Sequence, residues 1–294
     1  MDASPTAVET AILEFGDLLA VLALGLLLVE LLWLRRRGRL GKDRVLEMLA
    51  SFSTLLPAIA VEILLTASWI AVYFGVQALV PWQIPTTVWT AVLAVILVDL
   101  AYYWEHRLSH EIRLLWALAH SVHHSSPHFN QATAYRISFM DQFISPLFYL
   151  PIVALGFHPL LVLAAFVLIL AYQTWLHTEM VGRLGWLDQV FNTPSNHRVH
   201  HGADAGYLDR NYGAVLMLWD RLFGTYQAET ATPVYGLTKP LNSKNPLRVH
   251  FHEAGLLLRD LRAAESPGEA LGLLFRRPGW QPRHRREDRP LSNG

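Results

Sequence analysis

Long apolar stretches dominate the first part of the chain and predict helices that cross a membrane. The stretch 11–34 has 24 residues, and a membrane-spanning helix needs about 20. Three acidic residues interrupt it, namely Glu14, Asp17 and Glu30. The segment 35–44 follows at once and is rich in Arg and Lys, which predicts an outside N-terminus and a cytoplasmic 35–44 segment.

Two further spans are predicted after this basic segment. The stretch 48–80 carries one charge, Glu62, and Pro57 is expected to divide it into a short interfacial piece and a second span. An uncharged link with Trp82, which suits a membrane interface, then leads to a third span at about 88–104. Three crossings return the chain to the cytoplasmic side.

A fourth apolar stretch, 143–176, has 34 residues and contains no Asp, Glu, Lys or Arg. One helix of that length would measure about 51 Å, whereas the hydrocarbon core of a bilayer is about 30 Å thick. Pro146, Pro151, Gly156 and Pro159 therefore predict a hairpin of two short helices that turns near 156–159. Both ends of this hairpin are expected on the cytoplasmic side, so the polar segments that flank it can share one site.

These patterns together predict an all-α integral membrane protein with about four to five transmembrane helices and a cytoplasmic helical cap. We expect an N-terminal transmembrane region at 1–85, a central domain at 86–230 that includes the hairpin, and a cytoplasmic C-terminal tail at 231–294. Such a multi-pass protein would lie in the inner membrane of a bacterium or in the endoplasmic reticulum of a eukaryote.

Composition narrows the chemistry that the chain can perform. Lys and Arg together number 24, as do Asp and Glu, so no overall basic field indicates nucleic acid as a partner. Cysteine is absent, which excludes disulfides, thiolate-bound zinc, cysteine-ligated iron–sulfur clusters and a cysteine nucleophile. A metal ion would therefore bind to imidazole and carboxylate groups.

Eight of the 14 histidines fall in three clusters with the spacings HxxxH, HxxHH and HxxHH. The clusters are His106 and His110; His120, His123 and His124; and His197, His200 and His201. Residues i, i+3 and i+4 share one face of a helix, so each cluster can direct its imidazoles to one place. Eight ligands exceed the three or four of a single zinc site, which predicts two metal ions in the cytoplasmic cap. His177, at the cytoplasmic end of the hairpin, is expected as a ninth ligand or a close neighbour.

Carboxylates near the clusters could hold the second nitrogen of a metal-bound imidazole. The candidates are Asp99, Glu105, Glu111, Glu179, Asp204 and Asp209. Asp99 is the strongest, because it precedes His106 by seven residues on the same helical face and lies inside an apolar span. We predict Asp99 and Glu179 as catalytic-site residues. The other histidines are expected beside the site or outside it, and they are His128, His158, His250, His252 and His284.

The order and spacing of the clusters resemble the fatty acid hydroxylase / sterol desaturase superfamily of membrane di-iron enzymes. That family carries HxxxH, HxxHH and a distal (H/Q)xxHH, and the resemblance covers roughly 90–230. Sequence motifs around the clusters also match, including Asn192-Thr-Pro-Ser-Asn-His197-Arg-Val-His-His-Gly202 and Trp219-Asp-Arg-Leu-Phe-Gly-Thr225. Within the family, His177-Thr-Glu179 and Tyr235-Gly-Leu-Thr-Lys-Pro-Leu-Asn242 are most similar to the alkylglycerol monooxygenase branch.

This resemblance implies an O2-dependent di-iron lipid hydroxylase with two non-haem Fe ions. The substrate would be a membrane lipid, such as a fatty acyl chain, an alkylglycerol ether, a sterol-like molecule or an aminolipid. Since no flavin or NAD motif is visible, electrons must come from outside, from tetrahydrobiopterin or from a redox partner protein. The alkylglycerol monooxygenase branch uses the pterin.

Three other interpretations remain open at this point. A desaturase would use the same two irons on a lipid. A membrane zinc hydrolase would also use imidazole-bound metal, but with fewer ligands, and the sequence has no HExxH motif. A metal-binding transporter would place its sites in the middle of spans, whereas these clusters fall at or beyond the predicted span ends.

Overall fold

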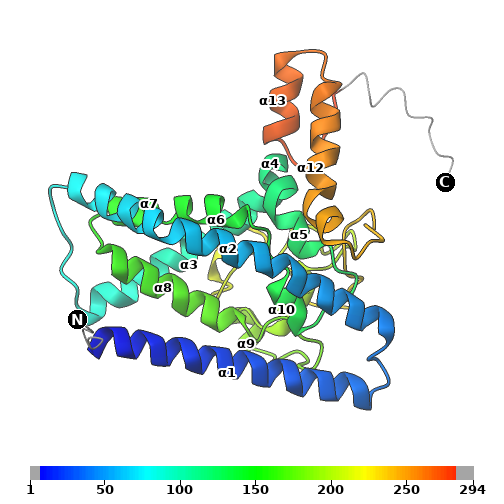
Figure 1. Cartoon of the computed structure of the whole chain (residues 1–294), viewed down its shortest axis with the longest axis horizontal. Helices are drawn as coiled ribbons and strands as arrows, with labels where there is room; N and C mark the ends of the chain where they lie inside the picture. The colour runs from blue at the N-terminus through cyan, green and yellow to red at the C-terminus, as the bar shows by residue number, and fades with distance from the viewer. Residues whose placement is uncertain (1–6, 283–294) are drawn as a thin grey trace.

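The computed structural model describes residues 7–282, with side chains from residue 18 onward. Three helices in this part are long and apolar enough to cross a membrane: α1 (Ala7–Arg36), α2 (Lys42–Leu79) and α3 (Val88–Glu111). α2 and α3 pack against α8 (Pro159–Gln173), and α1 runs along the outside of this group (Figure 1). Residues 7–282 contain no β-strand, only two isolated bridges, which confirms the all-helical prediction.

The helix α2 corrects one expectation, because it continues through Pro57 without a break. Its 38 residues correspond to a helix of about 57 Å. Thr54 and Ala58, on either side of the proline, are 0% and 1% exposed, so both flanks are held by packing. Tertiary contacts therefore outweigh the hydrogen bond that the proline cannot donate.

The hairpin turns where the sequence predicted, but its first limb is not a single helix. That limb consists of α6 (Asp141–Ile144), the 3-10 turn η3 (Ser145–Phe148) and α7 (Leu150–Ala154), and the second limb is α8. Gly156 has a φ of 100°, and a Cβ there would approach the Trp82 ring to 2.9 Å, so only glycine suits this turn. The hairpin and α3 share a buried core that includes Val98, Val153 and Ile169.

Short helices on one side of the long ones carry the second and third histidine clusters, whereas the first lies near the end of α3. Before the hairpin these are α4 (Arg113–Leu115), the π-helical turn η1 (Trp116–His120), α5 (Ser121–His124) and the 3-10 turn η2 (Gln131–Tyr135). After it come α9 (Leu187–Val190), α10 (Pro194–His200) and α11 (Leu218–Leu222). Most other residues from 177 to 245 form loops, so tertiary contacts must hold this region.

The region predicted as a C-terminal tail contains two helices, α12 (Pro246–Arg262) and α13 (Pro267–Phe275). They stand beside each other and project away from the long helices (Figure 1). Leu257 of α12 and Leu273 of α13 pack on Ala117 of η1, which ties this pair to the second histidine cluster. His284 and the rest of 283–294 lie outside the described residues.

Candidate metal centre

Each histidine cluster sits on a helical segment, as its spacing predicted. His106 and His110 are one turn apart on α3, and the third cluster occupies α10 and the residue after it. The second cluster differs, because His120 closes the π-helical turn η1 before α5 continues to His124. Such π-turns are rare and frequently occur at functional sites.

The structure brings five imidazoles together in a first histidine group. Its members are His106, His110, His120, His124 and His200, and one nitrogen of each lies within 4.8 Å of the others. The closest approaches join Nε2 atoms. His120 Nε2 lies 3.1 Å from that of His106 and 3.2 Å from that of His124, and His124 Nε2 lies 3.0 Å from that of His200.

A second histidine group contains four imidazoles from three separate parts of the chain. Its members are His123, His177, His197 and His201, and their nitrogens meet the same 4.8 Å limit. His177 Nε2 lies 3.1 Å from His123 Nε2 and 2.9 Å from His197 Nε2. The rings of His124 and His201 stack at 4.3 Å, so the two groups are direct neighbours. All nine histidines that the sequence singled out therefore lie in these two groups.

Hydrogen bonds to backbone carbonyls fix the tautomers of three of these rings. The Nδ1 atoms involved belong to His106, His123 and His200, and the carbonyls are those of Tyr212 at 2.9 Å, Arg136 at 3.3 Å and Arg210 at 3.0 Å. A carbonyl only accepts, so each Nδ1 must carry the proton. The Nε2 lone pair of each ring then points into its group, which is the arrangement that a metal ligand needs.

Two further nitrogens show that the groups are incomplete as hydrogen-bonding networks. His110 Nε2 and His201 Nε2 are buried and have no hydrogen-bond partner. Burial lowers the pKa of His123 to about 4 and holds the pKa of His201 well below its usual value, so these rings are neutral. An unsatisfied buried group costs about 1–3 kcal/mol, and a metal ion would satisfy the converging lone pairs. The residues present therefore fit two imidazole-bound ions of Fe, Cu, Zn or Ni.

Asp99 does not hold an imidazole, so that part of its predicted role is wrong. Its carboxylate, 1% exposed, accepts hydrogen bonds from the backbone of Val215 at 2.9 Å and Leu216 at 3.3 Å, and from the Trp219 indole at 2.8 Å. His106 shares its helical face but lies about 10 Å further along the axis. Asp99 instead anchors the segment that follows Tyr212. The Tyr212 carbonyl in turn accepts the hydrogen bond from His106 Nδ1.

Glu179 lies beside arginines rather than beside the histidine groups. Its carboxylate is 2.7 Å from Arg39 and 3.8 Å from Arg44, so it joins the loop after His177 to the basic link between α1 and α2. His128 makes a similar tie, with Nε2 2.9 Å from Asp43. These contacts are structural ties of the cap.

Of the other predicted carboxylates, Asp209 lies beside the first histidine group, with Oδ1 3.6 Å from His110 Nδ1. Glu105 has a different partner and accepts a hydrogen bond from Tyr149 at 2.5 Å. His158 caps α8 by accepting from the Leu160 backbone. Neither His250 nor His252 belongs to the two histidine groups.

Aromatic rings that the sequence analysis did not single out form walls of the two groups. Trp116 lies 5.1 Å from His110 and 5.6 Å from His124, measured between ring centres. Phe129 lies 5.5 Å from His177 and 5.1 Å from His201. Nothing in the sequence distinguishes these aromatic residues from others of the core, because their role depends on tertiary contacts.

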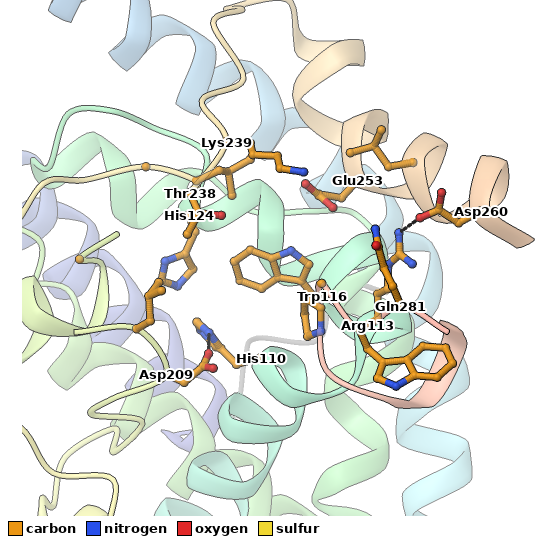
Figure 2. Close-up of a pocket in the computed structure, with 18 of the residues that line it drawn as sticks. His110, Arg113, Trp116, His124, Asp209, Thr238, Lys239, Glu253, Asp260 and Gln281 are labelled. Atoms are coloured by element: carbon orange, nitrogen blue, oxygen red, sulfur yellow. Dashed lines mark hydrogen bonds and ion pairs between the residues drawn. The ribbon is translucent and has the colours of Figure 1, made fainter. Parts of the chain in front are cut away.

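A cavity of about 400 Å³ opens beside the first histidine group. His110, His124 and His200 line one side, and Trp116 lies at its centre (Figure 2). The opposite side comes from the Tyr235–Asn242 motif and the C-terminal helices. It includes Lys239, Glu253 and Asp260, and Asp260 accepts a hydrogen bond from Arg113. The lining thus mixes charged and apolar side chains, and most of it comes from segments other than the long apolar helices.

Residues 91–225 match the model of the fatty acid hydroxylase family, and all nine grouped histidines lie within them. This match agrees with the resemblance to that family that the histidine spacing predicted. Alkylglycerol monooxygenase of Homo sapiens is 37% identical over 265 residues, which are 88% of this chain and 58% of the relative. The Danio rerio enzyme of that name is also 37% identical, with the same two shares.

Ornithine lipid hydroxylase OlsE of Rhizobium tropici is 34% identical over 143 residues, which are 46% of this chain and 41% of the relative. The chain spans somewhat more than half the length of the alkylglycerol monooxygenases that it matches. No solved structure matches the chain.

Proposed function

We propose that this protein is an integral membrane monooxygenase that uses two non-haem Fe ions and O2 to hydroxylate a lipid. The observation that carries the proposal is the convergence of nine buried or half-buried imidazoles in two adjoining groups. When bound, two irons with open positions would supply the O2 chemistry that an unactivated C–H bond requires. The relatives named as lipid hydroxylases and alkylglycerol monooxygenases support the reaction class.

The protein's own residues hold and shield this centre. The carbonyls that receive His106, His123 and His200 fix the direction of each imidazole before any metal binds. The Trp116 ring lies against the first histidine group and the Phe129 ring against the second, so each covers part of its group.

The lipid would approach from the membrane. A mostly apolar cavity of about 340 Å³ lies between α2, η3 and α8, lined among others by Trp69, Tyr73 and Phe166. Tyr149 also lines it and donates to Glu105, the residue before His106. An alkyl or acyl chain suits this cavity, and we propose an alkylglycerol as one substrate class, after the name of the Homo sapiens relative.

Electrons would arrive through the other cavity, beside Trp116. Hydroxylation consumes a C–H bond, O2, two electrons and two protons, and it yields an alcohol and water. The cavity beside Trp116 presents the cation Lys239 and the acid Glu253, so a small polar donor could hydrogen-bond to both. We propose tetrahydrobiopterin or a redox partner protein as the donor. Tetrahydrobiopterin and a redox partner protein are added to separate membrane samples, and the donor is the one that supports product formation.

We further propose four to five membrane crossings with the histidine groups on the cytoplasmic side. The basic link between α1 and α2 contacts the cap through Arg39 and Glu179, and through Asp43 and Lys244. The positive-inside rule places such a link in the cytoplasm. Cysteines can be introduced without background, since the chain has none, and one at the exposed Pro127 should react only with reagents that reach the cytoplasmic face.

The direct test of function compares membrane lipids from cells with active protein and cells with the His200→Ala variant. We expect one lipid class to gain one oxygen atom, or an ether lipid to be lost with release of an aldehyde. A product lighter by two hydrogens would establish the desaturase instead. Identical lipid profiles under O2 and added reductant would contradict both reactions.

A further inference from the structure

Helix α1 turns one carboxylate toward the protein interior. From Leu18 to Arg36 only Glu30 and Leu34 are buried, and Glu30 is 1% exposed. The rest of this helix is largely exposed apolar surface, suited to lipid. An acid that faces inward from such a helix is costly unless it has partners, so its contacts indicate what it does.

Both oxygens of Glu30 hold segments that adjoin the second histidine group. Thr178, the residue after His177, donates its hydroxyl to Glu30 Oε1 at 2.6 Å. The Gln131 backbone N–H donates to Glu30 Oε2 at 2.5 Å. Gln131 follows Phe129 by two residues, and the Phe129 ring lies against His177. One side chain therefore fixes two loops that meet at the same imidazole.

The His177 segment depends on such ties more than the other ligand segments do. His177 lies in the non-helical stretch between α8 and α9. Its Nδ1 has no hydrogen-bond partner. The position of the ring must therefore come from its backbone. Thr178 supplies two anchors there, its hydroxyl to Glu30 and its carbonyl to Arg198 at 3.1 Å.

We propose that Glu30 is a positioning residue for the metal ion of the second histidine group. The inference rests on the two-metal centre of the proposed function. Glu30 lies outside the matched residues 91–225, whereas all nine grouped histidines lie within them. The N-terminal helix therefore completes a centre whose ligands come from another part of the chain. Removing its hydrogen bonds releases the His177 turn, which weakens metal binding in the second group and leaves the first group intact. Losses of this indirect kind typically reach about 10–100-fold in affinity.

The experiment titrates Fe²⁺ into the purified, metal-stripped full chain under anaerobic conditions and measures bound iron per chain. Glu30→Leu removes both hydrogen bonds of the carboxylate, and leucine suits an apolar helix. Thr178→Val removes only the hydroxyl that donates to Glu30. We expect each variant to bind one Fe²⁺ as the wild type does and the other about 10–100-fold more weakly. Glu62→Leu, at an exposed acid of α2, is the matched control and should bind both normally.

A conservative variant and two backgrounds make the result specific. Glu30→Gln can accept from Gln131 and donate to Thr178, so it should restore most of the second binding step. In a His200→Ala background, Glu30→Leu should weaken the remaining ion, whereas in a His123→Ala background it should not.

Normal binding of both ions by Glu30→Leu would overturn the inference, and so would equal weakening of both. Failure of the wild type itself to bind two ions would instead contradict the two-metal centre of the proposed function.

Discussion

The two histidine groups are similar in ligand chemistry but differ in what holds them. The first group takes its anchors from within the matched residues 91–225, through α3 and the carbonyls of Arg210 and Tyr212. The second group depends on helices that precede this region, with Glu30 of α1 tied to the His177 turn. Two neighbouring sites of one centre can therefore respond differently to the same kind of substitution.

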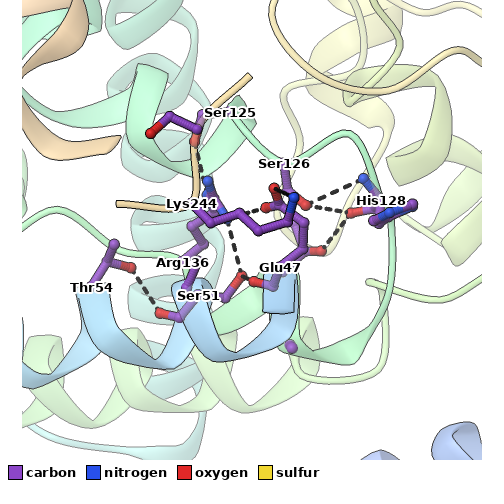
Figure 3. Close-up of polar contacts among 12 residues, drawn as sticks. Glu47, Ser51, Thr54, Ser125, Ser126, His128, Arg136 and Lys244 are labelled. Atoms are coloured by element: carbon purple, nitrogen blue, oxygen red, sulfur yellow. Dashed lines mark hydrogen bonds and ion pairs between the residues drawn. The ribbon is translucent and has the colours of Figure 1, made fainter. Parts of the chain in front are cut away.

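Helix α2 supports the second group in a parallel way. Arg136 is 0% exposed, and it donates to Glu47 of α2 at 3.0 Å and to Ser125 at 2.8 Å (Figure 3). Its own backbone carbonyl receives the His123 ring. A buried ion pair between the cap and α2 thus sits directly behind one ligand of the second group.

The largest effects should come from removing one ligand of each group. His200→Ala should lose the metal of the first group and His197→Ala that of the second, because each ring supplies a converging nitrogen. Activity should fall by more than about 100-fold in both, since indirect losses already reach that size. Metal content and lipid product are measured on the same preparation, with His252→Ala as the control. Loss of both metals from either variant would show that the groups are not separate.

A smaller effect is expected from the ion pair behind His123. Arg136→Leu leaves the Glu47 carboxylate buried with only Lys244, 3.7 Å away, which should cost about 3–5 kcal/mol in the free energy of unfolding. Unfolding in detergent micelles measures this. The double variant with Glu47→Leu should recover part of the loss, because no unpaired charge remains. A double variant as unstable as the single one would contradict the pairing.

Asp99→Asn should act on the first group through the backbone. The amide oxygen can still accept from Leu216 and Trp219, but the amide NH2 then faces the Val215 N–H, so the unfolding free energy should fall by about 1–3 kcal/mol. Iron retention in the first group should weaken and that in the second should not. Weakening in the second group alone would contradict the anchoring of the segment that carries Tyr212.

The smallest effect is expected at Glu179. Its ion pair with Arg39 involves a side chain that is 42% exposed, and such pairs contribute about 0–1 kcal/mol. Glu179→Gln should therefore keep both metal ions and nearly normal activity. A loss of activity with metal retained would instead restore the catalytic role predicted from the sequence.

The convergence of the histidines was predictable from the sequence because helical spacing is local. HxxxH and HxxHH place imidazoles on one face, and all nine predicted histidines lie in the two groups. Their division between the groups was not accessible. His123 and His124 are consecutive, as are His200 and His201, and each pair is split because successive helical residues point about 100° apart. The loops that join the helices decide which of two consecutive histidines enters which group.

The incorrect predictions concern contacts over long sequence separations. Pro57 reads as a helix breaker, but packing on both sides keeps α2 continuous. Asp99 was paired with His106 from spacing alone, whereas its partners lie more than 100 residues later in the chain. Glu30 appeared only as an interruption of an apolar run, since Thr178 is 148 residues away.

The central claim is that each histidine group holds one metal ion, and metal analysis of the purified full chain tests it most directly. Protein supplied with iron, freed of loosely bound ions and quantified by amino-acid analysis should contain two ions per chain, one for each group. The His200→Ala and His197→Ala variants should each contain one. A wild-type chain that reproducibly holds one ion or none would contradict the account.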